Sequence, residues 1–195
     1  MKAKWLIGVD EAGRGPLAGP VAVGVVKVVP DFDWSLIPGV DDSKKLSAEN
    51  REMIFRQAQE LRHLGKLDFA VAQVGPSVID TEGIVPAIKL ATKRCINRLE
   101  LNPRDVSFRL DGSLSAPLQF EQATIIGGDG LWPEIGLASI VAKVTRDRYM
   151  VRIARRYTQY GFAEHKGYGT KAHRAAIAKY GRSPIHRVSY CQSIN

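Results

Sequence analysis

The chain has 195 residues, of which 45% are apolar and 25% charged, and this composition is typical of one folded domain with a substantial core. Its two cysteines, Cys95 and Cys191, are too few for a disulfide framework and lack the spacing of a zinc site. The apolar run at residues 5–9 is too short for a signal peptide or a membrane span, so we expect a cytoplasmic protein that is not bound to a membrane.

The net charge of +8 is distributed unevenly along the chain. Residues 141–187 contain 12 lysines and arginines against two acids, a net charge of +10, whereas the remainder carries −2. A basic surface beside an acidic centre suits an enzyme that must hold phosphates and cage metal ions. The charge pattern alone leaves open a second interpretation, a solvated basic helix without a ligand.

The first part of the chain predicts strands followed by a helix. Two apolar, β-branched runs at residues 5–9 and 21–29 flank a glycine-rich connection and predict neighbouring strands. Apolar residues then recur at helical spacing over residues 48–64, and Ser47 is a suitable N-cap. Residues 67–72 are typical of a further strand.

The second part of the chain predicts helices around two short strands. A helix is expected over residues 84–99, strands at residues 106–110 and 123–126, and helices at residues 133–160 and 171–180. This order of elements indicates an α/β or α+β domain with a mixed sheet and a helical C-terminal part.

Acidic residues follow three of the predicted strands. Asp10 and Glu11 follow the first strand, Asp111 follows the strand at 106–110, and Asp129 comes after two glycines beyond the last strand. Oxygen ligands without clustered histidine or cysteine favour Mg²⁺ or Mn²⁺ over zinc. Two such ions about 3.5–4 Å apart would serve phosphodiester hydrolysis. The sequence does not show that these acids meet, and any one of them alone is more often a turn residue or a helix cap.

The neighbouring acids Asp10 and Glu11 pose a geometric question, because successive side chains of a strand face opposite ways. Both reach one site only if the backbone turns at the strand end, or if Glu11 contributes its carbonyl oxygen. The glycines that follow make such a turn easy.

The glycine-rich loop at residues 13–19 differs from a dinucleotide fingerprint. Its glycines are spaced G-x-G-x-x-x-G, it contains Pro16, and it leads into a β-branched run instead of a helix, so we expect no nucleotide cofactor. A backbone that closely approaches a sugar or phosphate, with Arg14 as a fork of donors, suits nucleic acid. A plain tight turn is the alternative.

At this point the sequence resembles the ribonuclease HII family. The similarity begins with DEAGRGPLAGPV at residues 10–21 and continues in segments that span nearly the whole chain. The further segments are DSKKL at 42–46, LDG at 110–112, GD at 128–129, ASIVAKVTRD at 138–147 and HKGYGT at 165–170. Gly128 departs from the lysine expected before the fourth acid, and Leu137 from a small residue; neither removes a metal ligand.

The resemblance implies a ribonuclease H-like α/β fold, a mixed five-stranded sheet flanked by helices with a helical C-terminal extension. It implies a catalytic core at residues 1–160, and residues 161–195 as a helical segment that completes the substrate groove of a single catalytic domain. The related ribonuclease HIII usually has an extra N-terminal domain, for which a signature starting at Asp10 leaves no room. We expect a monomer.

The resemblance also implies the activity, an endonuclease that cuts the RNA strand of RNA–DNA hybrids and the bond 5′ to single ribonucleotides in duplex DNA. Two Mg²⁺ or Mn²⁺ ions would assist, leaving 5′-phosphate and 3′-hydroxyl ends. The implied metal ligands and catalytic residues are Asp10, Glu11, Asp111 and Asp129. The implied contacts to the ribonucleotide are Gly13, Arg14 and Gly15 to the 2′-hydroxyl, the group DNA lacks, and Tyr168 to a sugar.

A helical projection of the long helix at 100° per residue adds phosphate-contact candidates. Ser139, Lys143 and Arg146 share one stripe, while the apolar Leu137, Ile140, Val141 and Val144 cluster opposite. Ser139 and Lys143 are the candidates here, Lys44 is a third in its loop, and Asp147 is expected to pair within the helix. A solvated polar face is the alternative.

Two rival functions remain open at this stage. The acids could be structural in a protein that only binds nucleic acid, or the chain could be a related nuclease that cuts branched DNA. Three histidines, His165, His173 and His186, also lie in the basic segment. They are either close to a metal site or hydrogen-bonded structural residues.

Overall fold

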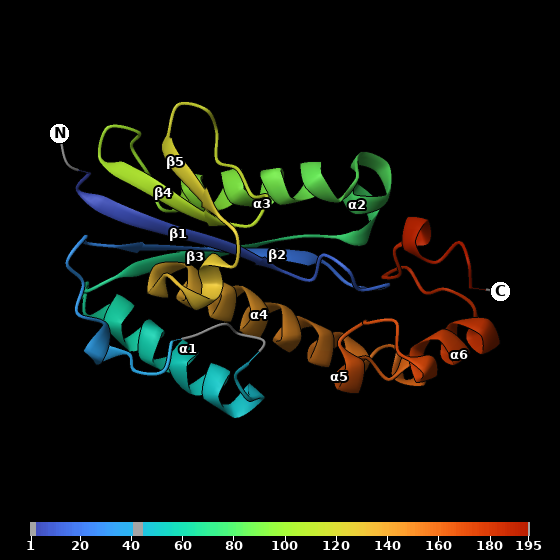
Figure 1. Ribbon diagram of the computed structural model, residues 1–195. Helices are drawn as coiled ribbons and strands as arrows, with labels where there is room; N and C mark the ends of the chain where they lie inside the picture. Colours follow the sequence, from blue (N-terminus) through green and yellow to red (C-terminus); the bar gives the residue numbers. More distant parts are fainter. Residues whose placement is uncertain (1–2, 41–44, 195) are drawn as a thin grey trace.

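The computed structural model describes residues 3–40 and 45–194, and within them the strands form one mixed five-stranded sheet. The sheet order is β3-β2-β1-β4-β5 (Figure 1). β1 pairs antiparallel with β2 and parallel with β4, β2 pairs antiparallel with β3, and β4 pairs parallel with β5. The strands are β1 Trp5–Ala12, β2 Val21–Val28, β3 Asp68–Val74, β4 Val106–Asp111 and β5 Glu121–Ile125. The predicted mixed sheet is confirmed.

Helices cover both faces of this sheet (Figure 1). α2 and α3 lie on one face, α1 and α4 on the other, and α5 and α6 lie beyond the sheet with the C-terminal segment. The α-helices are α1 Ala48–His63, α2 Pro76–Glu82, α3 Ile84–Arg98, α4 Pro133–Ala154, α5 Phe162–His165 and α6 Lys171–Tyr180. Short 3₁₀ turns are η1 Trp34–Leu36, η2 Gly128–Gly130, η3 Thr158–Tyr160 and η4 Val188–Tyr190. In the described ranges, we find no helix with the length and apolar character needed to cross a membrane.

The structure differs most from the prediction at the end of β1, at the end of α4 and in one additional helix. β1 continues to Ala12, because its antiparallel pairing with β2 extends through the acids to the Ala12–Ala22 pair. The helix expected over residues 133–160 ends at Ala154, and residues 158–160 form the separate turn η3. The short helix α2 was not predicted, since seven residues with only Ile79 buried give too weak a periodicity.

Each face of β1 contributes to a different core, as the alternation of a strand requires. Ile7 and Val9 join the core under α3, while Leu6 packs toward the core shared by α1 and α4. Asp10 therefore faces α4, and Glu11 faces the other way. The side of the sheet on which α4 packs thus determines that Asp10, and not Glu11, faces this helix.

Helix α4 approaches the central strands closely enough that two positions exclude any side chain. A Cβ atom at Gly8 would lie 2.1 Å from the carbonyl oxygen of Glu134, and one at Gly24 would lie 2.2 Å from that of Ala138. Gly24 pairs with Asp10 across β1 and β2. The backbone of α4 consequently lies directly over the acid-bearing part of the sheet.

We predict that Gly24→Ala destabilises the protein, because the new methyl group meets backbone that cannot rotate away. The free energy of unfolding should fall by about 1–3 kcal/mol in denaturant titrations. Gly75→Ala is the matched control, since nothing lies within 4 Å of its Cβ and its φ is not in the left-handed region. Equal effects of the two substitutions would contradict the steric argument.

Candidate active site

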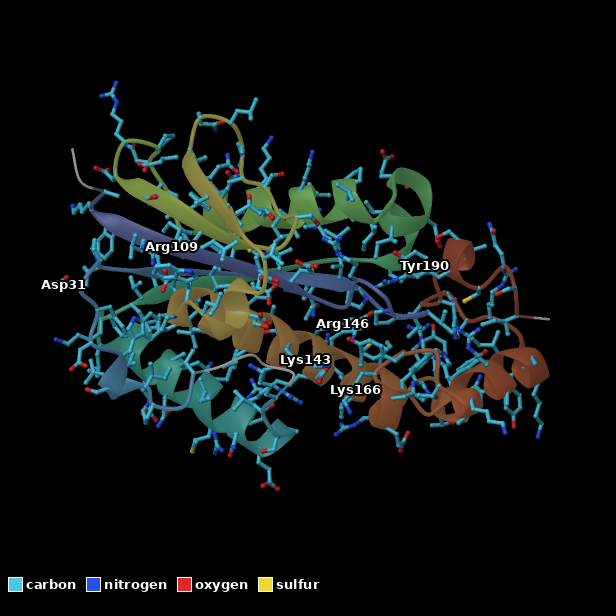
Figure 2. The ribbon with its side chains drawn as sticks, viewed as in Figure 1. Asp31, Arg109, Lys143, Arg146, Lys166 and Tyr190 are labelled. Carbon is cyan, nitrogen blue, oxygen red and sulfur yellow. The ribbon has the colours of Figure 1, made fainter. Side chains whose placement is uncertain are left out.

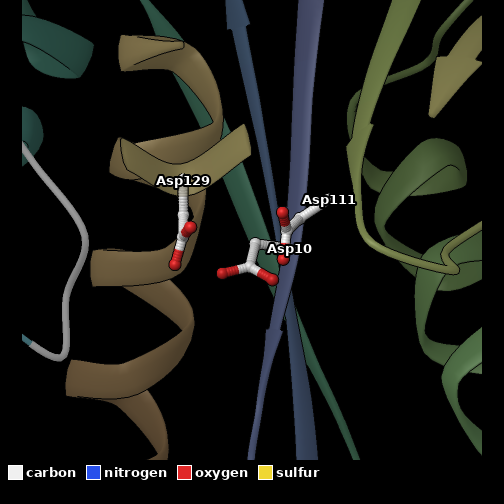
Figure 3. A group of neighbouring side chains, drawn as sticks. All are labelled: Asp10, Asp111 and Asp129. Carbon is white, nitrogen blue, oxygen red and sulfur yellow. The ribbon is translucent and has the colours of Figure 1, made fainter. Parts of the chain in front are cut away.

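Three carboxylates gather at the end of the sheet where β1 and β4 finish (Figure 3). One oxygen each of Asp10, Asp111 and Asp129 lies within 4.8 Å of the other two. Asp10 and Asp111 come from neighbouring parallel strands, and Asp129 faces them from η2. Parallel strands end at the same edge of a sheet, which is why Asp10 and Asp111, 101 positions apart in sequence, meet here.

Asp129 does not end a strand, as the sequence pattern suggested, but lies in η2 beyond β5. Asp111 Oδ1 accepts a hydrogen bond of 2.7 Å from the backbone N–H of Gly128, which ties this turn to β4. A Cβ at Gly128 would lie 2.7 Å from Cδ1 of Ile135 and 3.5 Å from Asp111 Oδ1. The glycine that departs from the family pattern therefore sits in a crowded turn against the acids.

Burial and the neighbouring acids both act on the protonation of Asp10. Burial raises the pKa of Asp10 to about 8 from the ordinary 3.8, a hydrogen bond with Ser139 opposes this, and the charges of Glu11 and Asp111 add to it. Asp10 is 4% exposed and Asp129 6% exposed. Buried carboxylate oxygens in such a group are donors that suit a hard divalent cation, so these residues fit Mg²⁺ or Mn²⁺.

Glu11 lies beside this group, but its carboxylate contacts Arg14. Because β1 stays extended through Ala12, the side chain of Glu11 faces away from α4, and its Oε1 accepts a hydrogen bond of 2.8 Å from Arg14 Nε. Its carboxylate is not among the three gathered oxygens. The backbone turn that would bring both side chains together does not occur within β1, so a role for Glu11 as a ligand stays a prediction.

A cavity of about 190 Å³ joins the acids to the other residues predicted for the site. It is lined by Asp10, Glu11, Ala12, Gly13, Arg14, Gly15, Asp111, Ser139, Lys143 and Tyr168. Asp129 completes the acidic group next to it. Lys44 lies outside the described residues. Ala12 was not predicted as a site residue, although it lies between the predicted Glu11 and Gly13.

Lys143 and Tyr168 form the boundary between this cavity and a larger, basic one of about 800 Å³. The Lys143 ammonium lies 5.4 Å from the centre of the Tyr168 ring and 3.0 Å from Asp147 Oδ1, which confirms the expected pair within the helix. Tyr168 is 42% exposed. Basic residues that line the larger cavity are Arg51, Lys143, Arg148, Arg152, Arg155 and Lys166. The basic side chains of the larger cavity therefore begin directly beside the carboxylates.

Arg146 does not share a phosphate-facing stripe with Ser139 and Lys143, contrary to the helical projection. Its side chain is fully buried, and its guanidinium donates to the carbonyl oxygens of Pro20 at 2.9 Å and Lys166 at 3.0 Å. Figure 2 shows Lys143, Arg146 and Lys166 together where α4 meets α5. A projection gives only an angle around the helix, and the C-terminal segment covers α4 at this level.

The three histidines pack together behind Tyr168 and hold its loop. His173 Nδ1 bonds the Tyr168 carbonyl oxygen at 2.9 Å, and His165 Nδ1 accepts from the backbone N–H of Gly167 at 3.1 Å. His186 Nε2 lies 3.1 Å from His173 Nε2. These contacts agree with the structural interpretation of the histidines.

Known proteins resemble this chain over almost its full length. The family model described as ribonuclease HII matches residues 7–193. A ribonuclease HII from Syntrophotalea carbinolica is 43% identical over 95% of this chain and 84% of its own length. One from Coxiella burnetii is 45% identical over 95% of this chain and 87% of its own.

Solved structures show the same architecture. A PCNA:RNase HII complex from Archaeoglobus fulgidus contains a chain with a TM-score of 0.75 and 25% identity, covering 96% of this chain and 94% of that one. The ribonuclease H2 of Pyrococcus horikoshii has a TM-score of 0.72 and 26% identity, over 95% of this chain and 93% of that one. The predicted ribonuclease H-like fold is confirmed.

The raised pKa of Asp10 yields a prediction for the metal-free protein. The folded pKa exceeds the unfolded one, so the folded state binds more protons, and stability should fall as the pH rises from about 3.8 toward about 8. Asp10→Asn should remove this loss, and its melting temperature in chelator should exceed that of the wild type most at the alkaline end.

The measurement is a series of melting curves between about pH 5 and about pH 9 in chelator. Asp31→Asn, an exposed acid distant from the site in Figure 2, is the control and should follow the wild type. Parallel curves for wild type and Asp10→Asn would show that Asp10 titrates normally.

Proposed function

Because the chain belongs to the ribonuclease HII family, we propose that it cuts the RNA strand of RNA–DNA hybrids and the bond 5′ to single ribonucleotides in duplex DNA. The family consists of divalent-metal-dependent ribonucleases H that act on nucleic acid. The observation that carries the proposal is the group of three carboxylates, Asp10, Asp111 and Asp129, two of which line a cavity that is also lined by the glycine turn, Lys143 and Tyr168.

Asp10, Asp111 and Asp129 would hold the cations, with Glu11 as a fourth ligand through its carboxylate or carbonyl oxygen. We propose two Mg²⁺ or Mn²⁺ ions, which when bound activate water and stabilise the leaving oxygen. The products would be a 5′-phosphate and a 3′-hydroxyl. Ser139, which hydrogen bonds Asp10, keeps the carboxylate oriented, and Lys143 offers a charge to a substrate phosphate at the cavity edge.

The choice of RNA would rest on the turn formed by Gly13, Arg14 and Gly15. Nothing lies within 4 Å of a Cβ built at Gly15, so the folded protein itself does not require glycine there. Open space beside a backbone that lines the cavity suits close approach of a ribose. The exposed ring of Tyr168 across the cavity can stack on a sugar.

The duplex would extend from the acids along the larger basic cavity. Its cations come from α1, α4 and the segment after α5, so core and C-terminal segment would share the groove. We retain the division into a core at residues 1–160 and a completing segment at residues 161–195, in a monomer. Such phosphate contacts would make binding strongly dependent on salt.

We predict that Asp10→Asn and Asp129→Asn abolish cleavage without abolishing binding, because they remove cation ligands and leave the basic groove intact. Cleavage of a DNA duplex bearing one ribonucleotide should fall at least about 100-fold, while the Kd in Ca²⁺ stays within about 3-fold. Wild-type protein in chelator should match the variants. A wild type that leaves this duplex intact in Mg²⁺ would refute the proposed function, and efficient cutting of branched all-DNA would favour the junction nuclease.

We predict that Gly15→Ala separates folding from RNA recognition. Its melting temperature should be unchanged, because the methyl group meets no protein atom within 4 Å. Cleavage at a single ribonucleotide should fall by about 10-fold or more, since the methyl group occupies the space proposed for the ribose. Tyr168→Ala should lower cleavage at the same position without changing metal binding. Unaltered cleavage rates for both variants would show that neither the glycine turn nor Tyr168 recognises the ribonucleotide.

A further inference from the structure

One buried guanidinium holds the glycine turn from behind. Arg187 is fully buried, and its Nη2 donates to the carbonyl oxygen of Gly13 at 2.6 Å, its Nη1 to that of Arg14 at 2.8 Å, and its Nε to that of Gly19 at 3.0 Å. Three carbonyls at both ends of one loop thus converge on a side chain that comes from near the C-terminus.

The backbone around Arg187 is fixed to the same loop. The N–H of Arg187 donates to the Leu17 carbonyl oxygen at 2.8 Å, and the N–H of Gly19 donates to that of Ile185 at 2.8 Å. Ala18 and His186 form an antiparallel bridge. The guanidinium therefore cannot move independently of the loop that it binds.

From the outer side, Asp80 on α2 holds the segment that follows Arg187. Its carboxylate accepts from the N–H of Val188 and of Ser189, both at 2.9 Å, and from the Ser189 hydroxyl at 2.5 Å. Burial works to raise the pKa of Asp80, but the hydrogen bonds from Ser189 and Val188, together with the charge of Arg187, prevail and lower it. Asp80 thus remains an ionised anchor, one step removed from the glycine turn.

Burying the charged guanidinium of an arginine costs desolvation free energy, so Arg187 is not explained by a gain in stability alone. Burial lowers the pKa of Arg187 to about 10, and the charge of Arg146 adds to this. In the described part of the chain, no carboxylate forms a salt bridge with Arg187 within 4.0 Å. The charge of Asp80 and a hydrogen bond with Tyr190 also favour the charged form of Arg187. The three carbonyl oxygens that accept from its guanidinium all belong to one loop, so the residue orients the peptide groups of that loop.

The orientation of these carbonyls also fixes the direction of the N–H groups of the turn. The peptide bonds of the described residues are trans, so the C=O of one residue and the N–H of the next point in opposite directions. Because the carbonyls of Gly13 and Arg14 point to the buried guanidinium, the N–H groups of Arg14 and Gly15 point away from it. Both residues line the cavity with the acids.

We propose that Arg187 is a positioning residue for ribonucleotide selectivity, which orients the N–H groups of Arg14 and Gly15 toward the substrate sugar. The inference rests on the proposed function. Arg187 touches neither substrate nor metal ligand; it acts through the two peptide groups. Asp80 supports it by fixing the segment that carries Arg187.

The test compares Arg187→Lys with Arg98→Lys. Lysine keeps the charge of Arg187 but cannot donate to three carbonyls in a fixed fork. Arg98, on the surface of α3, donates to the Val71 carbonyl oxygen at 2.6 Å and is the matched control. For each protein, the Kd in Ca²⁺ is measured for a duplex with one ribonucleotide and for the all-DNA duplex of identical sequence.

For Arg187→Lys we expect the ratio of the two Kd values to move about 10-fold toward no preference, because the donors that read the 2′-hydroxyl are misplaced. Affinity for all-DNA and Mn²⁺ binding, measured by calorimetry, should be unchanged, since the groove and acids are intact. Arg98→Lys should match the wild type in all three measurements. Retained preference in folded Arg187→Lys, or equal weakening of both duplexes and of Mn²⁺ binding, would overturn the proposal.

Asp80→Asn keeps the proposal testable should Arg187→Lys fail to fold. It changes a surface anchor and leaves the buried guanidinium in place, so the preference should weaken by about 3-fold with all-DNA binding unchanged. An unchanged preference in Asp80→Asn would then count against the inference. A wild type without ribonucleotide preference would instead refute the proposed function itself, so the two failures are distinguishable.

Discussion

The contact between helix α4 and the two central strands sets the geometry of everything around it. Gly8 and Gly24 leave the helix backbone no intervening side chains, so α4 lies against β1 and β2 at the level of Asp10. Ser139 and Lys143, which follow on the same helix, are thereby placed at the edge of the acidic cavity. This packing interaction therefore sets the position of Asp10 relative to Ser139 and Lys143, the first polar residues of α4 beside the acids.

The sequence predicted most of the fold and much of the site because strand ends and helix faces are local signals. Apolar runs placed Asp10 and Asp111 at strand ends, helical periodicity predicted α1 and α3, and the residues that bound α6 predicted that helix. Asp129 is different, since it reaches the site from a 3₁₀ turn that has no periodic signature. That the acids meet follows from sheet order, which a sequence pattern does not contain.

What the sequence could not reveal is which charges are buried. Arg146 and Arg187 belong to the basic segment that predicted a polyanion-binding surface, yet both are fully buried and bind backbone carbonyls. In a composition count they are indistinguishable from surface arginines such as Arg152 and Arg155, which line the basic cavity. The cationic surface is consequently smaller than the net charge suggests, and it is concentrated beside Lys143.

The hydrogen bond between Arg187 and Gly13 joins residues 174 positions apart, so the ribosome synthesises the two partners at different times. On a ribosome that adds about 5–20 residues per second, the first strand emerges roughly 10–35 s before its distant anchor is made. Until then the glycine turn that follows the acids of β1 lacks the guanidinium that binds its carbonyl oxygens. A chain that stops before Arg187 would contain Asp10, Asp111 and Asp129 but not the side chain that binds the carbonyl oxygens of Gly13 and Arg14.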